Sequence, residues 1–401
     1  MHLAVNAYFW NQPNTGSGQY TRQLVYHLNR LVSDLDITLI YPQAPGEAGP
    51  AGVPPSVRVE TVAVRPGHLG KVLFEQRGFP AAAGRVGATL AHVPYWGAPL
   101  RSPVPLVVTV HDLTTLLVPD YHRGLRARLY NALVSASARG AGHVLTDSYA
   151  SKTDIVGRLG IPEEKVTAVY LGVGAQYSPR ADNSLIDMAV LRKYDLPDFY
   201  VLYLGGYELH KNIVTLLHAY TYVAQALGEE YPLVLAGRKP VGESPIYPDY
   251  EGIIERAGLG KHVRWIGYVD EEDKPVLYRN AEVFVFPSRH EGFGLPPLEA
   301  MACGTPVVAS DSGSLPEIVG PAGFAIDPDD ARHMAGAIIS LVMEEQLAAD
   351  LRKQGPEQAA KFTWQNTALE TLAVYAKVAG GVGTTDHGPQ STDDGPPSAD
   401  R

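Results

Sequence analysis

The chain alternates short apolar runs with helix-length amphipathic runs, and this alternation starts twice. Apolar runs of strand length occur in the first half at 3–8, 37–42, 57–63, 88–93, 105–111 and 143–147, and in the second half at 199–206, 232–237, 262–269, 281–288 and 305–310. Amphipathic stretches such as 21–32 and 124–138 separate them. Since strands that alternate with helices form parallel sheets covered on both faces, the order predicts an α/β fold of two doubly wound, Rossmann-like domains facing a central cleft.

The boundary between the two domains is expected near residues 173–198, where turn-forming residues replace apolar ones. We assign 1–180 to an N-terminal domain and 181–365 to a C-terminal domain, with a last helix at 366–380. Residues 381–401 are rich in Gly, Ser, Thr, Asp and Pro. Such a segment cannot bury enough apolar surface to offset its ordering entropy, so we predict a disordered tail.

Charge and hydropathy exclude several classes of protein. The formal net charge of −10 argues against a nucleic-acid-binding protein. No apolar stretch approaches the roughly 18 residues that a membrane span needs, and the first residues lack the pattern of a signal peptide. We therefore expect a cytoplasmic protein that is at most peripheral to a membrane.

The charge is divided unevenly along the chain. Residues 1–185 carry 16 Lys and Arg against 12 Asp and Glu, whereas the rest carry 17 against 31. A basic N-terminal half is compatible with an anionic acceptor or an anionic membrane surface, although an unevenly charged solvated surface gives the same count. Within this half, 123–140 is a basic amphipathic stretch, for which contact with an acceptor and contact with a membrane both stay open.

The most informative motif spans residues 288–310, with the sequence SRHEGFGLPPLEAMACGTPVVAS. It reads as the end of a buried strand, a glycine loop, a helix and another strand. Gly292 and Gly294 allow the backbone to approach a ligand closely, and the prolines at 296 and 297 suit the first turn of a helix. The amino end of that helix offers free N–H groups and a positive dipole end to an anion such as a diphosphate.

Two carboxylates flank this helix start. Glu291 lies on the loop and Glu299 lies in the first turns of the helix, so both can face one ligand. Carboxylates in this position suit hydroxyl groups, one on a donor sugar and one on a ribose.

The whole motif resembles the donor site of glycosyltransferase family 4, whose members are retaining enzymes of the GT-B fold, and the similarity extends over residues 1–380. The resemblance implies that Glu291 acts catalytically at the transferred sugar and that Glu299 binds the nucleotide ribose. It also implies that the last helix crosses back to the N-terminal domain. The backbone amides expected to hold the sugar and phosphate belong to Gly292, Phe293, Gly294 and Leu295.

Three further loops complete the expected donor site. His210, Lys211 and Asn212 follow a strand and a glycine turn, in a place where the family commonly has Arg-Lys-Asn, so a titratable residue replaces one cation. Lys211 is expected to neutralise the diphosphate, with His210 and Asn212 in donor binding. Gly16 and Gly18 open the first helix and would free backbone amides near the phosphates. His111, at a strand end, corresponds to a family histidine that faces the donor sugar.

The predicted reaction transfers a hexose from a nucleotide diphosphate to a hydroxyl of a glycan or glycolipid acceptor, with retention of configuration. Similarity of several segments to mannosyltransferase-B-like members favours GDP-mannose, with a UDP-hexose as the second choice and surface polysaccharide as the product. The histidines show no metal-ligand spacing, and the resemblance implies no metal and no cofactor. Alternatives are a phosphorylase or synthase that makes a small glycoside, and a non-catalytic sugar-nucleotide-binding protein; the absence of GxGxxG disfavours a dinucleotide oxidoreductase.

Overall fold

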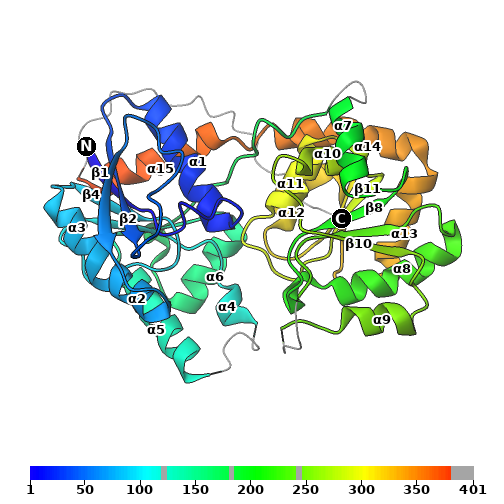
Figure 1. Ribbon diagram of the computed structural model, residues 1–401, viewed down its shortest axis with the longest axis horizontal. Coiled ribbons are helices and arrows are strands. Elements are labelled where there is room, and N and C mark those ends of the chain that lie inside the picture. The colour runs from blue at the N-terminus through cyan, green and yellow to red at the C-terminus, as the bar shows by residue number, and fades with distance from the viewer. Residues whose placement is uncertain (119–123, 180–184, 241–245, 381–401) are drawn as a thin grey trace, which may run out of the picture.

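The structure is a computed structural model that describes residues 1–118, 124–179, 185–240 and 246–380. Two separate parallel sheets form its two halves, each flanked by helices (Figure 1). The predicted pair of Rossmann-like domains is therefore confirmed. Each of the apolar runs predicted as a strand contains one.

The first sheet has the strand order β3-β2-β1-β4-β5-β6-β7. Its strands are β1 (His2–Asn6), β2 (Asp36–Gln43), β3 (Arg58–Ala63), β4 (Leu90–Val93), β5 (Leu106–Thr109), β6 (His143–Thr146) and β7 (Val166–Ala168). Its helices are α1 (Gly16–Leu31), α2 (His68–Leu73), α3 (Phe79–Arg85), α4 (Thr114–Leu117), α5 (Leu125–Gly140) and α6 (Tyr149–Leu159). A π-helical turn, Phe74–Gly78, joins α2 to α3.

The second sheet has the order β10-β9-β8-β11-β12-β13. Its strands are β8 (Val201–Leu204), β9 (Leu233–Ala236), β10 (Val263–Gly267), β11 (Val283–Phe286), β12 (Val307–Ser310) and β13 (Phe324–Ile326). The helices that follow the first sheet are α7 (Leu185–Lys193), α8 (Ile213–Leu227), α9 (Tyr250–Arg256), α10 (Lys274–Asn280), α11 (Leu295–Ala302), α12 (Leu315–Val319), α13 (Ala331–Met343), α14 (Glu345–Ala359) and α15 (Trp364–Val378).

The strand order decides where a ligand can bind. It reverses between β1 and β4 in the first sheet and between β8 and β11 in the second. In open parallel sheets, ligands bind outside the carboxyl ends of the strands at such a reversal. The loops after β1, β4, β8 and β11 are therefore the ones that the fold presents for binding.

The last helix, α15, returns to the first half of the molecule (Figure 1). It packs along α1, and the Tyr375 hydroxyl lies 2.6 Å from Nδ1 of His92 on β4. The Thr367 hydroxyl donates to the Tyr170 carbonyl at 2.7 Å. The proposed division between residues 180 and 181 and the proposed disordered tail, 381–401, lie outside the described residues.

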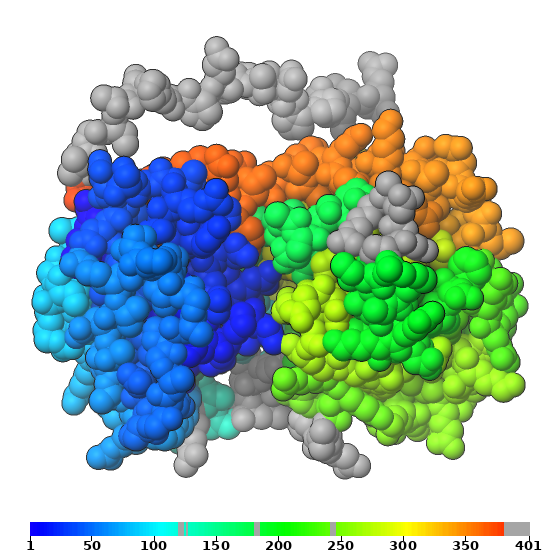
Figure 2. Space-filling model, turned by 45° about the horizontal axis from the view of Figure 1, so that its top comes forward, coloured from blue at the N-terminus to red at the C-terminus, as the bar shows by residue number. Residues whose placement is uncertain are grey.

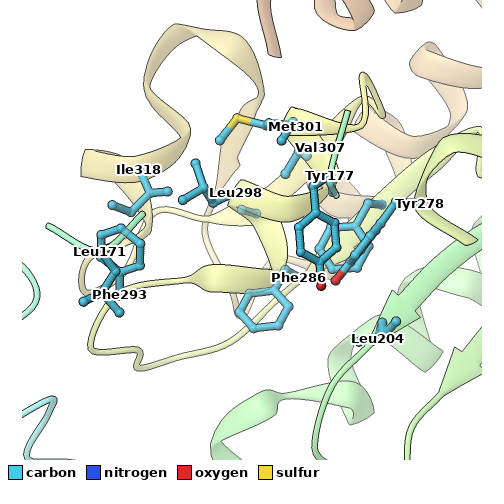
Figure 3. Packing of buried hydrophobic residues seen from close by; sticks show 14 of the residues in the cluster. Leu171, Tyr177, Leu204, Tyr278, Phe286, Phe293, Leu298, Met301, Val307 and Ile318 are labelled. Atoms are coloured by element: carbon cyan, nitrogen blue, oxygen red, sulfur yellow. The ribbon is translucent and has the colours of Figure 1, made fainter. Parts of the chain in front are cut away.

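The helix of the glycine motif, α11, is anchored by apolar side chains. Leu298 and Met301 are fully buried, as are Val307 on β12 and Ile318 on α12 (Figure 3). This packing fixes the helix relative to the strand ends. The loop before α11 is thereby held at the edge of the second sheet.

Candidate active site

A cavity of about 470 Å³ lies where the loops of the two halves meet. The space-filling view shows these halves, blue and yellow-green, facing each other across the cleft (Figure 2). Nine of the twelve predicted site residues line the cavity: Gly16, His111, Lys211, Glu291, Gly292, Phe293, Gly294, Leu295 and Glu299. Residues that lie almost 300 positions apart in the chain thus share one site.

The glycine loop has the local structure that its sequence predicts. Helix α11 begins at Leu295, with prolines in its first turn, and Gly294 at its N-cap has φ 114°. That backbone conformation favours glycine. At Gly292 a Cβ atom would lie 2.3 Å from the carbonyl oxygen of His111, so only glycine permits this close contact between the two halves. The backbone at Gly294 and Leu295 then borders the cavity and brings two N–H groups to the start of α11, whereas Pro296 and Pro297 have none.

Lys211 and Glu291 form an ion pair inside the cavity. Nζ of Lys211 donates to Oε1 of Glu291 at 2.6 Å, and both side chains are largely buried. The ammonium also lies 5.5 Å from the ring centre of Phe286, at the end of β11. An ammonium has three donors and Glu291 takes one of them, so Lys211 can contact an anion without leaving its partner.

Glu299 is buried on α11 and lines the same cavity. Tyr278 donates a hydrogen bond of 3.0 Å to its Oε2. Burial raises the pKa of Glu299, although Lys274 opposes that shift. The hydroxyl ends of Tyr177 and Tyr278 lie next to each other (Figure 3). The carboxylate is therefore fixed in position before any ligand arrives.

Each ring nitrogen of His111 faces an oxygen atom that can accept a hydrogen bond. Its Nδ1 lies 2.7 Å from Oδ2 of the buried Asp147, and its Nε2 lies 3.2 Å from the carbonyl oxygen of Pro94. A carbonyl cannot supply a proton, so Nε2 carries one, and a second proton lies between His111 and Asp147. Burial would lower the pKa of His111, but the carboxylate of Asp147 and its hydrogen bond raise it above the ordinary value. The geometry therefore favours the imidazolium form of His111.

Three predicted residues do not line this cavity. Gly18 is buried in α1, where a Cβ atom would lie 2.0 Å from the carbonyl oxygen of Gln12. The amide of the buried Asn212 donates to the carbonyls of Pro287 and Pro328. The His210 carbonyl accepts a hydrogen bond of 2.8 Å from the Arg289 amide. Close packing against Gln12 explains Gly18, and hydrogen bonds to two loops explain Asn212. We therefore assign neither residue to the binding of the sugar-nucleotide donor.

The structure also brings in residues that the sequence did not single out. Asp147 and Lys274 line the cavity, and Tyr278 supports Glu299. Asp147 directly follows β6, and His111 lies two residues after the end of the neighbouring β5. That shared position at adjacent strand ends was the available signal for the pairing. No comparable pattern marks Lys274 or Tyr278.

Direct contacts join the two halves beside the cavity. Oε1 and Oε2 of Glu317 on α12 accept hydrogen bonds from the amides of Ala150 (2.7 Å) and Tyr149 (3.0 Å) at the start of α6. The Tyr170 hydroxyl also donates to Glu317 at 3.0 Å. A carboxylate at a helix amino end is favoured by the free N–H groups and by the helix dipole. The structure therefore shows the cleft with its two sides in contact.

A second cavity, of about 570 Å³, adjoins the first. It shares the Asn14–Thr15 segment with the first cavity and extends to Arg238 and Tyr268, whose guanidinium carbon and ring centre are 5.0 Å apart.

In the described parts of the chain, His, Cys, Asp and Glu side chains form no group of three suited to a metal ion. None of the helices described there is long and apolar enough to span a bilayer.

Comparison with known proteins gives consistent matches across the chain. A model described as Glycosyltransferase Family 4 matches residues 14–177, and one described as Glycosyl transferases group 1 matches residues 192–358. The O-antigen chain mannosyltransferase B of Escherichia coli is 35% identical over 270 residues, which are 67% of this chain and 69% of that protein.

Two further proteins extend the comparison. The serotype-specific mannosyltransferase WbdA of Escherichia coli is 31% identical over 299 residues, which cover 71% of this chain and 35% of that protein. Among solved structures, sucrose-phosphate synthase from Thermosynechococcus elongatus superposes with a TM-score of 0.77 at 25% identity, covering 94% of this chain and 98% of that one.

Proposed function

The chain belongs to glycosyltransferase family 4, and from that premise we propose that it transfers a hexose from a nucleotide diphosphate to a hydroxyl of a glycan or glycolipid acceptor. The observation that carries the proposal is the Lys211–Glu291 pair beside the amino end of α11 in one cavity. A cation and the backbone amides of the loop that leads into α11 suit a diphosphate, and a carboxylate next to them suits the sugar hydroxyls.

Mannose is the hexose that the relatives favour. The two Escherichia coli relatives are named as mannosyltransferases, and one acts on the O-antigen chain. We therefore propose GDP-mannose as the donor and a surface polysaccharide as the product, with a UDP-hexose as the alternative donor. Calorimetric titration of the protein with GDP and with UDP distinguishes the two donors, because the two ligands differ only in their base.

The proposed chemistry depends on charge that develops on the leaving phosphate. Lys211 and the N–H groups before α11 would stabilise this charge, while Glu291 holds the donor sugar and Glu299 holds the ribose. His111, as an imidazolium, adds a positive charge to the same cavity. In the proposed retaining course, the departing phosphate oxygen takes the acceptor proton on the face that it leaves, so no separate base is needed.

Neutralisation by Lys211 and helix amides leads us to propose a reaction that needs neither metal nor cofactor. Turnover is then expected to persist in excess EDTA and to give an α-glycoside from an α-linked donor. The one-bond C–H coupling of a mannosyl product reports its anomeric configuration by NMR. A β-linked product, or activity that EDTA abolishes and Mn²⁺ restores, would refute the retaining, metal-independent assignment.

We propose a protein that works in the cytoplasm and makes a peripheral contact with the inner face of the membrane through α5 and its neighbour α2. Leu125 and Leu129 on α5 are 72% and 61% exposed, and Leu69 on α2 is 71% exposed. The rings of His68 and Tyr130 lie 5.1 Å apart, so the two helices are adjacent. The sequence of α5 contains arginines and no acidic residue. Exposed leucines beside arginines suit an anionic lipid surface.

This contact is testable by sedimentation with vesicles. The protein is expected to sediment with vesicles that contain anionic phosphatidylglycerol and not with vesicles of neutral phosphatidylcholine alone. Replacing Leu125 and Leu129 by Ser should reduce sedimentation without affecting the binding of the nucleotide. Equal sedimentation of both proteins would contradict the assignment to this surface.

A further inference from the structure

A lysine in the N-terminal half is enclosed by aromatic rings outside the cavity described above. Nζ of Lys71 lies 5.2 Å from the ring centres of Tyr8 and Phe9, 5.5 Å from that of Tyr95 and 5.6 Å from that of Tyr130. Such distances place a cation within range of attraction by each ring. The ammonium is therefore fixed in place by rings from three separate segments of the chain.

A buried carboxylate, that of Glu75, also lies next to this ammonium. Oε1 of Glu75 lies 3.7 Å from Nζ of Lys71, and the Tyr130 hydroxyl donates to Glu75 at 3.3 Å. Glu75 is fully buried in the π-helical turn, and burial raises its pKa to about 7. A buried charge of this kind is costly unless it is paired. Single-turn π-helical segments occur frequently at functional sites.

The cluster borders a third cavity, of about 400 Å³. Tyr8 and Lys71 belong both to the cluster and to the cavity wall, where Tyr41, Asn11 and Gln12 add aromatic and amide groups. The cavity lies at the carboxyl edge of the first sheet, since Tyr8 follows β1 and Tyr41 lies near the end of β2.

This cavity continues the row formed by the other two. It shares Asn11 and Gln12 with the second cavity, which shares Asn14 and Thr15 with the first. A chain-like ligand can therefore follow the loop 11–15 from the reacting centre to Tyr8. The donor does not account for the third space, because Lys211, Glu291 and Glu299, which are proposed to hold it, line the first cavity only. The third cavity is lined by residues of the N-terminal half alone.

The charges around the third cavity largely offset one another. Arg65 and Lys71 contribute two positive charges, Glu47 contributes one negative charge, and Glu75, whose pKa burial raises to about 7, contributes part of another. A site of such small net charge, with tyrosine rings and planar amide side chains, suits a neutral, hydroxyl-rich ring better than it suits a diphosphate. The fixed ammonium then offers donors to hydroxyl groups at little entropic cost.

We propose that this cavity is a subsite for a neutral sugar residue of the acceptor glycan, at a distance from the hydroxyl that reacts. The proposal rests on the proposed function, because it presumes a glycan acceptor. Its consequence is that the protein discriminates between acceptors of different length, and that Tyr8 and Lys71 determine this preference.

The test compares binding of α-linked mannotriose with binding of methyl α-mannoside by calorimetry. The natural protein is expected to bind the trisaccharide about tenfold more tightly, which corresponds to about 1.4 kcal/mol. Tyr8→Leu and Lys71→Met should remove that advantage and leave GDP or UDP affinity unchanged. Lys165→Met, an exposed lysine of the same half, serves as the matched control.

The outcomes separate the two proposals. An equal affinity for both mannosides in the natural protein, or an advantage that persists in Tyr8→Leu, overturns the subsite. Because Lys71→Met leaves Glu75 without its cation, Tyr8→Leu is the decisive variant if Lys71→Met fails to fold. Failure of the natural protein to bind GDP or UDP would instead overturn the proposed function, while the mannotriose result would still report on the cavity.

Discussion

Lys211 offers the most direct test of the proposed chemistry, through the substitution Lys211→Met. Methionine keeps the aliphatic stem beside Phe286 and removes only the ammonium. Unit charges about 4 Å apart interact by about 4 kcal/mol at an effective dielectric constant of 20. Loss of one transition-state donor typically lowers turnover by about 10²–10³-fold, or about 2.7–4 kcal/mol. Because both values agree, we expect a fall in kcat of about 10²–10³-fold.

Part of that loss belongs to Glu291, which keeps its carboxylate but loses its partner 2.6 Å away. A double-mutant cycle with Glu291→Gln separates the two contributions. The assay is steady-state release of the nucleotide diphosphate, and Lys261→Met is the control because Lys261 is a surface lysine that pairs with Glu229. A kcat within a few-fold of the natural protein would show that Lys211 does not stabilise the leaving group.

Three further changes test other parts of the site. Glu299→Ala should weaken binding of the nucleotide diphosphate by about 1–3 kcal/mol, the range for hydrogen bonds to a charged group, and an unchanged calorimetric affinity in a folded variant would exclude the ribose role. Glu317→Gln removes the charge at the amino end of α6 and should loosen the contact between the halves by about 1 kcal/mol, seen as a larger radius of gyration in X-ray scattering than for the exposed control Glu357→Gln. Asp147→Asn removes the carboxylate that raises the pKa of His111, so burial should lower that pKa. Since the imidazolium is present only below its pKa, the alkaline limb of the kcat/KM profile should move to lower pH, and a limb that stays in place would contradict a charged role for His111.

Much of the fold follows from features that the sequence states directly. Buried parallel strands need continuous apolar runs, so β8 and β11 were apparent as VLYL and VFVF. The strands that were missed are β7 and β13, each three residues long at a sheet edge. So short a run carries too few apolar positions to be distinguished from a loop.

The site was predictable where chemistry and local structure coincide. Gly294, with its φ of 114°, and the prolines that follow set the course of the backbone by themselves, so the loop before α11 could be read from sequence. Gly18 shows the opposite case. A glycine required by a neighbouring carbonyl looks in the sequence like one that frees an amide for a ligand, and only the position of Gln12 distinguishes them.

Partners that depend on the approach of the two halves could not be read from sequence, and they explain why the site exists only in this arrangement. Gly292 touches the backbone of His111, and the Ser151 hydroxyl lies 3.2 Å from the carbonyl oxygens of both residues. These contacts join the loop that carries Glu291 to the strand end that carries His111. Any opening of the cleft therefore separates the imidazolium from the Lys211–Glu291 pair, and closure brings the positive charges together around the same space. Such an arrangement links charge stabilisation to the exclusion of water, because the contacts that assemble the site are those that close it.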